Sequence, residues 1–134
     1  MRAILINVYR KTVTEVELPD DVRGWLDSAY SQLSLDAPPE NRCSMVEIGC
    51  RIPRKDHKED TLYVDEEGLL HPSDHFFYYE GAHQPFAGSG LICGSDPRTG
   101  HSIPAAVDVP SVLRKVRFMN RFDAALLAQE RGRR

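Results

Sequence analysis

Apolar residues fall in two short runs over the first 18 residues, and this pattern predicts a β-hairpin. In Arg2 to Tyr9, Ala3, Leu5 and Asn7 alternate with Ile4, Ile6 and Val8 on the two faces of a strand. The second strand, Thr12 to Leu18, mixes Val13, Val16 and Leu18 with Thr and Glu. Only Arg10 and Lys11 separate the two strands, which is the length of a tight turn.

The period changes after Pro19, where the pattern becomes helical. We predict an amphipathic helix over residues 20–33 with Asp20 as its N-cap, because Asp is a favoured capping residue. We expect Trp25, the only tryptophan, to anchor this helix to the sheet. Apolar residues recur here at spacings of three and four, at Val22, Trp25, Leu26, Ala29 and Leu33.

The middle of the chain reads as strands joined by polar turns. Residues 34–42 contain APPEN and predict a loop, and residues 44–52 predict a strand. The charged run RKDHKED at 54–60 is typical of an exposed turn. Residues 61–71 then predict strand, turn and strand, with the turn at Asp65 to Gly68.

Four consecutive aromatic residues lie within DHFFYYE, residues 74–80. In a strand, Phe77 and Tyr79 face one side and Tyr78 faces the other. Core packing covers one side, so the other needs a loop, a helix or a second molecule. Because exposed apolar patches usually mark interfaces, we predict self-association or partner docking through this strand, with Phe77, Tyr78 and Tyr79 as contact residues.

The C-terminal third allows two interpretations. A short strand at Leu91 to Gly94, a turn at SDPRTG and an edge strand within 101–107 come first. Asp108 is then suited to cap a helix with Pro110 in its first turn. Either one final helix follows, or KVRFM at 115–119 forms a last strand before a shorter helix.

These elements predict an α+β fold in one domain, residues 1–134. We expect a mainly antiparallel sheet, covered on one face by the helix that carries Trp25. The 134 residues, with 41% hydrophobic and 28% charged residues, suit one globular core. No apolar run has the length of a membrane span, and no signal peptide is recognisable. We therefore expect a cytoplasmic protein without a membrane partner.

Charge is distributed unevenly along the chain. Residues 114–134 form a basic C-terminal segment with seven Lys or Arg and two acids, a net charge of +5. Residues 1–113 contain ten basic and eighteen acidic residues, a net charge of −8. An acidic body repels phosphate backbones, so nucleic acid is an improbable partner.

The glycine-rich stretch QPFAGSGLICGSDPRTGHS, residues 84–102, does not fit a phosphate loop. A Walker loop needs GK followed by Ser or Thr, and a dinucleotide fingerprint needs a following helix. Here an apolar strand pattern follows Gly90 instead, so the glycines predict turns and a bulge. We expect the stretch to shape a rim or a turn without a catalytic group, open to contact with a ligand or a partner, with Asp96 and Arg98 projecting from its turn. Arg98 matches phosphate oxygens through its planar guanidinium.

The candidate catalytic and metal-binding residues do not form recognised motifs. Ser89 lacks the glycine spacing of a nucleophile elbow, and Cys93 lies in an apolar strand. The three cysteines have no paired spacing, which favours free thiols in a reducing cytoplasm. We expect no metal and no other cofactor, because in an extended segment His71 and His75 lie about 13 Å apart. The acids and histidines near them are Asp74, Glu80 and His83.

Three stretches resemble a family of small uncharacterised proteins carried by phages, plasmids and other mobile elements. The matching segments are Met1 to Ile6, Leu62 to Leu70 and Pro85 to Gly94, which cover about a quarter of the chain. The family typically shows an M-(K/R)-A-I-L-I start, an acidic strand and turn, and a P-x-A-G-x-G segment. Residues 34–60 and the arginine-rich end do not match it, and no catalytic residue carries over. The resemblance implies an accessory protein of a mobile element in a bacterial cytoplasm.

Together these features favour a binding protein without catalytic activity. We expect a counter-defence factor that inhibits a host protein or sequesters a nucleotide-like signal, so its partner is a host protein or a small anionic ligand. Homo-oligomerisation through the aromatic strand fits this interpretation. The alternative is a small cytoplasmic enzyme whose site no motif reveals. Mimicry of DNA by the acidic body is a weaker possibility, because the basic segment opposes it.

Overall fold

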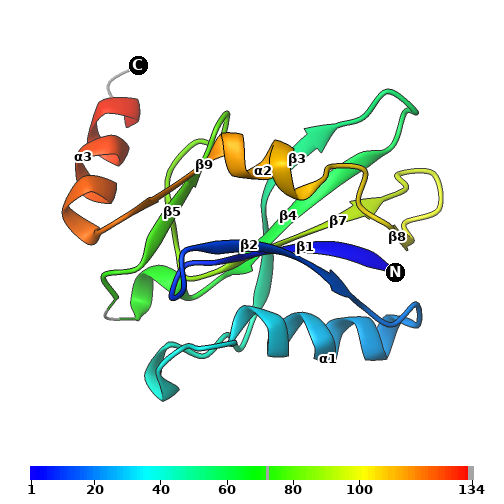
Figure 1. Cartoon of the computed structure of the whole chain (residues 1–134), viewed down its shortest axis with the longest axis horizontal. Coiled ribbons are helices and arrows are strands. Elements are labelled where there is room, and N and C mark those ends of the chain that lie inside the picture. Colours follow the sequence, from blue (N-terminus) through cyan, green and yellow to red (C-terminus); the bar gives the residue numbers. More distant parts are fainter. Residues whose placement is uncertain (72, 133–134) are drawn as a thin grey trace.

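The main sheet has six strands, all paired antiparallel (Figure 1). The computed structural model describes residues 1–71 and 73–132. The hairpin of β1 and β2 forms one edge of this sheet, and the hairpin of β3 and β4 forms the other, with β7 between them. The short β8 pairs with β7 beyond the end of β1. The strands are β1 (Arg2–Asn7), β2 (Thr12–Glu17), β3 (Val46–Pro53), β4 (Glu59–Asp65), β7 (Gly90–Ser95) and β8 (Ser102–Ile103).

A second, three-stranded antiparallel sheet lies against one face of the main sheet. Its central strand is β5 (Phe76–Tyr79), between β6 (Phe86–Ala87) and β9 (Val116–Met119). Side chains from both sheets meet in one apolar layer, in which Ile4, Leu62 and Phe77 are fully buried. This layer is the larger of the two cores.

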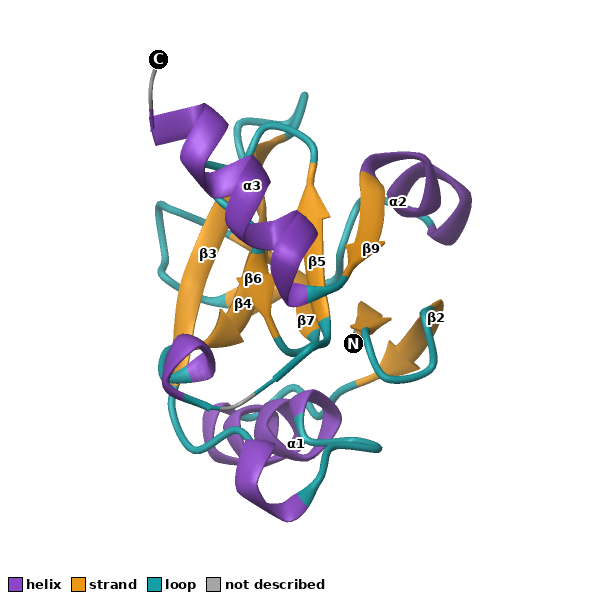
Figure 2. Cartoon of the chain, turned by 90° about the vertical axis from the view of Figure 1, so that its left-hand side faces the viewer, coloured by secondary structure: helices purple, strands orange, loops and turns teal. Residues whose placement is uncertain are grey.

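Three helices cover the sheets on different sides. α1 (Val22–Leu33) packs over β1 and β7 on the opposite face of the main sheet, where Leu5, Leu91 and Ala29 form the second apolar layer. α2 (Val109–Lys115) packs beside β2. Figure 2 shows α3 (Arg121–Gly132) in front of the second sheet, and its contacts are with β5 and β9. None of the described helices is long and apolar enough to cross a membrane.

The predicted α+β class and the mainly antiparallel sheet under a Trp25 helix are confirmed. The N-cap of α1 is Asp21 rather than Asp20: its carboxylate accepts a hydrogen bond from the Gly24 N–H at 2.8 Å. Residues 68–70 form a short 3₁₀ turn, η2 (Gly68–Leu70), so the second strand predicted there is absent. Another 3₁₀ turn, η1 (Pro39–Asn41), lies in the predicted loop.

The second interpretation of the C-terminal third is correct. α2 ends at Lys115, and the chain continues directly into β9 because β5 offers it a free edge. α3 then follows as a separate helix. Within the basic segment, residues 133–134 lie outside the described part of the chain.

The aromatic strand β5 is a core strand and not a docking surface, which corrects the prediction for its three rings. Phe77, Tyr78 and Tyr79 are only 0%, 8% and 2% exposed. The main sheet covers one side of β5, α3 packs against it, and β6 and β9 pair with its edges. The Tyr78 hydroxyl donates to the Ala82 carbonyl at 3.0 Å, and the Arg131 guanidinium lies over its ring. Both faces of the strand are therefore covered by the chain itself.

Two glycines of β7 are explained by close approach of neighbouring groups. A Cβ atom on Gly90 would lie 2.6 Å from the Phe77 ring, and one on Gly94 would lie 2.6 Å from the Pro104 carbonyl oxygen. Gly88 and Gly100, by contrast, have positive φ angles of 85° and 73° at turns. The glycine-rich stretch thus turns the chain and lets the core and the Pro104 segment pack closely.

Candidate functional site

One hollow, which we term the aromatic pocket, lies beside the start of α1. It has a volume of about 440 Å³. The start of α1 forms one wall, Tyr63 of β4 forms the floor, and the loop that leads into β8 forms the other wall. The lining residues are Asp20, Val22, Trp25, Tyr63, Thr99, Gly100, His101 and Ser102.

Two aromatic rings give this pocket its character. Trp25 and Tyr63 are both half-buried, and their rings meet edge to face with centroids 5.2 Å apart. The Asp21 cap fixes the first turn of α1 and so sets the height of Trp25 above the sheet. Burial raises the pKa of the Tyr63 hydroxyl above 10, so this ring is neutral at physiological pH. The pair offers uncharged aromatic surface to a planar ligand.

The two residues that the sequence singled out in the following turn have different roles. The Asp96 carboxylate accepts from the Arg98 N–H at 3.0 Å, and its carbonyl accepts from the Gly100 N–H at 2.7 Å. Asp96 therefore holds the turn in shape. Arg98 is exposed at the tip, close in sequence to the lining residues Thr99 and Gly100. Thr99 and Gly100 of this turn line the pocket, whereas Asp96 and Arg98 are not among its lining residues.

A second hollow, which we term the charged pocket, lies between the β3–β4 turn and α2. Its volume is about 590 Å³. Cationic residues of two elements line it: Arg54 and Lys55 of the turn, and Arg114 of α2. The remaining lining residues are Pro53, Asp56, Asp60, Ala106, Val107, Asp108 and Ser111.

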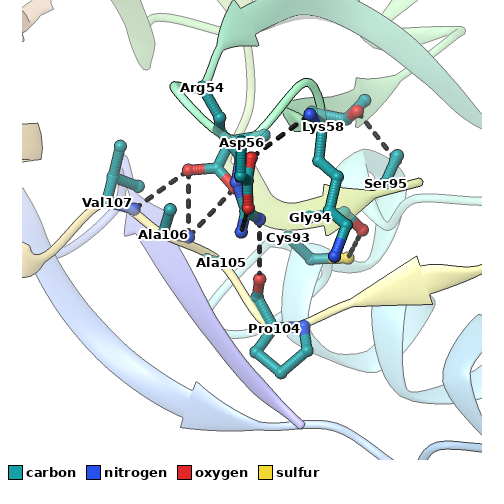
Figure 3. Close-up of polar contacts among 12 residues, drawn as sticks. Arg54, Asp56, Lys58, Cys93, Gly94, Ser95, Pro104, Ala105, Ala106 and Val107 are labelled. Atoms are coloured by element: carbon teal, nitrogen blue, oxygen red, sulfur yellow. Dashed lines mark hydrogen bonds and ion pairs between the residues drawn. The ribbon is translucent and has the colours of Figure 1, made fainter. Parts of the chain in front are cut away.

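One fully buried carboxylate, that of Asp60, organises the base of the charged pocket. It accepts hydrogen bonds from the N–H groups of Ala106 and Val107 at 2.9–3.1 Å. Its other partner is the Arg54 guanidinium, which also donates to the Pro104 carbonyl at 3.2 Å. Figure 3 shows Arg54 reaching down to Pro104 beside the backbone of Ala106 and Val107. We term this set of bonds the Asp60 latch, because it ties the segment after β8 to β4.

A cluster of titratable groups lies at the far end of β4. The Asp65 carboxylate lies 4.0 Å from Nδ1 of His71, and the Tyr9 and His75 rings meet at a tilt of 57° with centroids 5.1 Å apart. Burial raises the pKa of Asp65, and burial with the nearby Asp65 charge raises that of Cys43 to about 12. A thiol with such a pKa is a poor nucleophile at neutral pH. The hollow beside this cluster holds about 10 Å³, which is room for one water and not for a substrate.

The other candidate reactive groups are engaged in the fold. The Ser89 hydroxyl is buried and accepts from the Val8 N–H at 3.2 Å. Burial raises the pKa of the Cys50 and Cys93 thiols, and all three cysteines are free. Among the described residues, no three His, Cys, Asp or Glu side chains converge as a metal site would require.

Comparison with protein-family models, with curated proteins and with solved structures finds no match for this chain. Function is therefore inferred from the two pockets and their residues.

The pockets use residues whose function the sequence did not indicate. Trp25 was expected to be only an anchor, and its partner Tyr63 is far from it in the chain. Lys55 lies in a run read as a solvated turn, and Arg114 faces it only because α2 folds back over the main sheet. A half-buried ring and an unpaired cation have no spacing signature, so only the tertiary fold reveals them. Of the predicted residues, Asp96 and Arg98 adjoin the aromatic pocket in sequence, whereas Phe77, Tyr78 and Tyr79 line neither the aromatic nor the charged pocket.

Proposed function

We propose that the protein binds a nucleotide-like small molecule in the aromatic pocket and sequesters it without chemical change. The observation that carries this proposal is the half-buried pair of Trp25 and Tyr63 rings at a hollow of about 440 Å³. Small-ligand pockets typically measure about 300–1,000 Å³ and combine apolar or aromatic walls with a few polar groups. Stacking of a base on an aromatic side chain contributes about 1–3 kcal/mol.

The polar groups around the rings suit the rest of such a ligand. Thr99, His101 and Ser102 offer donors and acceptors for a base edge or a sugar. Arg98, on the same turn, supplies a guanidinium for a phosphate group. Asp20 is the one acidic side chain among the lining residues, and it pairs with the terminal ammonium at 3.3 Å. The arrangement therefore favours a planar ring with an anionic substituent directed toward the turn.

The biological setting follows from the resemblance to small proteins of mobile elements. A phage or plasmid product that withholds a nucleotide signal from its host would act as a counter-defence factor in the bacterial cytoplasm. Such a protein needs affinity and a rigid pocket but no reactive group. The catalytic alternative is weaker because the titratable cluster near Asp65 has no room for a substrate.

The fluorescence of Trp25 tests this proposal directly, since it is the only tryptophan. Titration with a panel of mono-, di- and cyclic dinucleotides is expected to quench or shift the emission for at least one member. Chromatography of the mixture should return the nucleotide unchanged. No spectral response to any member of the panel, or steady conversion of the nucleotide, would contradict the proposal.

A charge variant separates binding in the pocket from general effects. Val22 lines the pocket yet is 85% exposed, so Val22→Glu is expected to fold normally and weaken nucleotide binding by about tenfold through charge repulsion. Ser31→Glu adds the same charge to an exposed position of α1 outside the pocket. Equal affinities of the two variants would place the ligand elsewhere. Arg98→Ala should weaken binding of the nucleotide but not of the matching nucleoside.

A second candidate, inhibition of a host protein, is favoured by apolar side chains on the outer surface. Leu69 and Leu70 of η2 and Phe122 and Leu126 of α3 are each more than half exposed. Capture from host lysate by the wild type, but not by Phe122→Ser/Leu126→Ser, is the outcome expected for this function. Equal capture by a folded double variant would remove α3 from consideration.

A further inference from the structure

We infer that the charged pocket is a second binding site, for a small anion that carries phosphate groups, of about the size of pyrophosphate. The inference goes beyond the proposed nucleotide binding, because it depends on different residues. Lys55 of the β3–β4 turn and Arg114 of α2 both line the pocket, and both are exposed. No described residue forms a hydrogen bond or an ion pair with either side chain.

The carboxylates of the pocket, in contrast, are already engaged. Asp60 accepts from two backbone N–H groups and from Arg54. Asp56 receives two hydrogen bonds from the Arg54 guanidinium, at 2.7 and 3.1 Å, and a third from the Lys58 N–H. Asp108 caps α2 by accepting from the Ser111 N–H at 2.9 Å. Arg54 is likewise occupied by its two carboxylates and the Pro104 carbonyl.

Free donors remain in the pocket once Asp56 and Asp60 have taken their partners, and the exposed Asp108 carboxylate still adds one free acceptor oxygen. The donors are the Lys55 ammonium, the Arg114 guanidinium and the Ser111 hydroxyl. A ligand that satisfies these donors must be anionic and present several acceptor oxygens, as phosphate groups do. Three cations and three carboxylates line the pocket, so its formal charge balances when empty. Binding then depends on directed contacts from Lys55 and Arg114 more than on a broad positive field, and one phosphate leaves much of the 590 Å³ unfilled.

The Asp60 latch gives this pocket a fixed base. It holds the Ala106 and Val107 backbone in place, so the wall that leads into α2 and Arg114 is positioned before any ligand arrives. Pre-organisation of this kind lowers the entropic cost of binding. The same segment carries His101 and Ser102 into the aromatic pocket, so the two pockets lie on either side of residues 101–108.

Isothermal titration of the full chain with inorganic pyrophosphate tests the site, together with ¹H–¹⁵N spectra of the same samples. Lys55→Gln/Arg114→Gln is expected to weaken pyrophosphate binding at least tenfold while leaving the melting temperature unchanged, since both side chains are exposed and unpaired. The matched control is Lys115→Gln/Arg117→Gln, which removes two exposed cations from the adjoining residues outside the pocket. Shifts in the wild type should centre on residues 54–56 and 106–114.

Three outcomes would overturn the inference. The first is no heat and no spectral shift at millimolar pyrophosphate, and the second is an equal loss of affinity in both double variants. The third is equally tight binding of citrate, which would show that the site selects charge and not phosphate. Trp25 emission distinguishes this site from the proposed nucleotide site: pyrophosphate should bind without quenching, and Val22→Glu should bind it normally. Failure of one proposal therefore leaves the other standing.

Discussion

The two faces of the main sheet are covered by different elements, and beside each cover lies a pocket of different chemistry. On one face, a second sheet and α2 cover the apolar side chains, and the Asp60 latch ties down the segment that leads into α2. On the other face, α1 alone packs over β1 and β7, and Tyr63 of β4 stays half-buried beside Trp25. The first pocket is charged and the second aromatic.

This difference follows from what each cover is made of. A helix satisfies its own backbone groups, so its edge presents side chains, here the Trp25 ring. A connecting segment such as 104–108 brings unpaired N–H groups and needs an acceptor, which Asp60 supplies. The buried Asp60 carboxylate therefore lies where irregular backbone packs on the sheet, and the half-buried Trp25 ring lies where a helix packs on it. Substitutions in each region test how far this distinction determines stability and binding.

The largest effect is expected from Asp60→Ala. It leaves the Ala106 and Val107 N–H groups without their acceptor and removes one partner of Arg54, so we expect a loss of about 3 kcal/mol in the free energy of unfolding. Urea denaturation measures it. Asp56→Ala is the control, because its carboxylate binds the same Arg54 at the exposed rim and should contribute less than about 1 kcal/mol. Equal losses of stability in the two variants would mean that the Asp60 latch contributes no more than an ordinary surface ion pair.

Gly94→Ala, a substitution in β7, is expected to disturb the same Asp60 latch. The added methyl would lie 2.6 Å from the Pro104 carbonyl oxygen and 2.7 Å from Nη1 of Arg54. Overpacking of this kind destabilises by about 1–3 kcal/mol. Gly132→Ala is the matched substitution, since a methyl at Gly132 has no atom within 4 Å and only helix propensity changes. An unchanged stability of Gly94→Ala would show that the segment around Pro104 shifts readily to make room for the methyl group.

Local periodicity was enough to predict the first hairpin, α1 and the strand character of β5. It could not decide whether residues 115–119 form a helix or a strand, because Val112, Val116 and Met119 fit both spacings. In addition, no Gly or Pro separates α2 from β9. The free edge of β5, a tertiary feature, decides between them. The same limit explains the error over the aromatic rings, since α3, β6 and β9 cover β5 from distant positions.

The candidate sites were less predictable than the fold. The turn at Asp96 and Arg98 carries a local signal, and it does border the aromatic pocket. Trp25 meets Tyr63, and Lys55 shares a pocket with Arg114, because of how α1 and α2 pack. No spacing in the sequence encodes that packing.

Removal of the α1 cap is expected to have a smaller effect, on the aromatic side of the sheet. Asp21→Ala leaves the Gly24 N–H without its acceptor and should lower the free energy of unfolding by about 1 kcal/mol. Asp20→Ala removes only an exposed carboxylate paired with the terminal ammonium and should contribute less. Because the cap sets the first turn, Asp21→Ala should also shift Trp25 emission. A lower melting temperature for Asp20→Ala than for Asp21→Ala would contradict the assignment of Asp21 as the N-cap.

The smallest effect concerns the two acids at the ends of β4, which face opposite sides of the sheet. Asp60 has two backbone donors and Arg54, whereas Asp65 accepts one backbone hydrogen bond, from the Glu67 N–H, and has only His71 at 4.0 Å as a cationic neighbour. Burial raises the pKa of Asp65 above 3.8, so the folded protein favours its neutral form. Its stabilising contribution is complete below that pH and is lost as pH rises through the higher folded value.

Asp65→Asn keeps an acceptor for Glu67 but cannot ionise. The wild type should therefore lose stability relative to this variant as pH rises from about 3.5 to 6, a range set by the ordinary carboxyl pKa and the upward shift. Urea denaturation at several pH values measures the difference. His71→Gln removes the one cationic neighbour, raises the pKa of Asp65 further and should extend the loss to higher pH. A difference that grows toward acid pH would instead make Asp65 a stabilised carboxylate like that of Asp60.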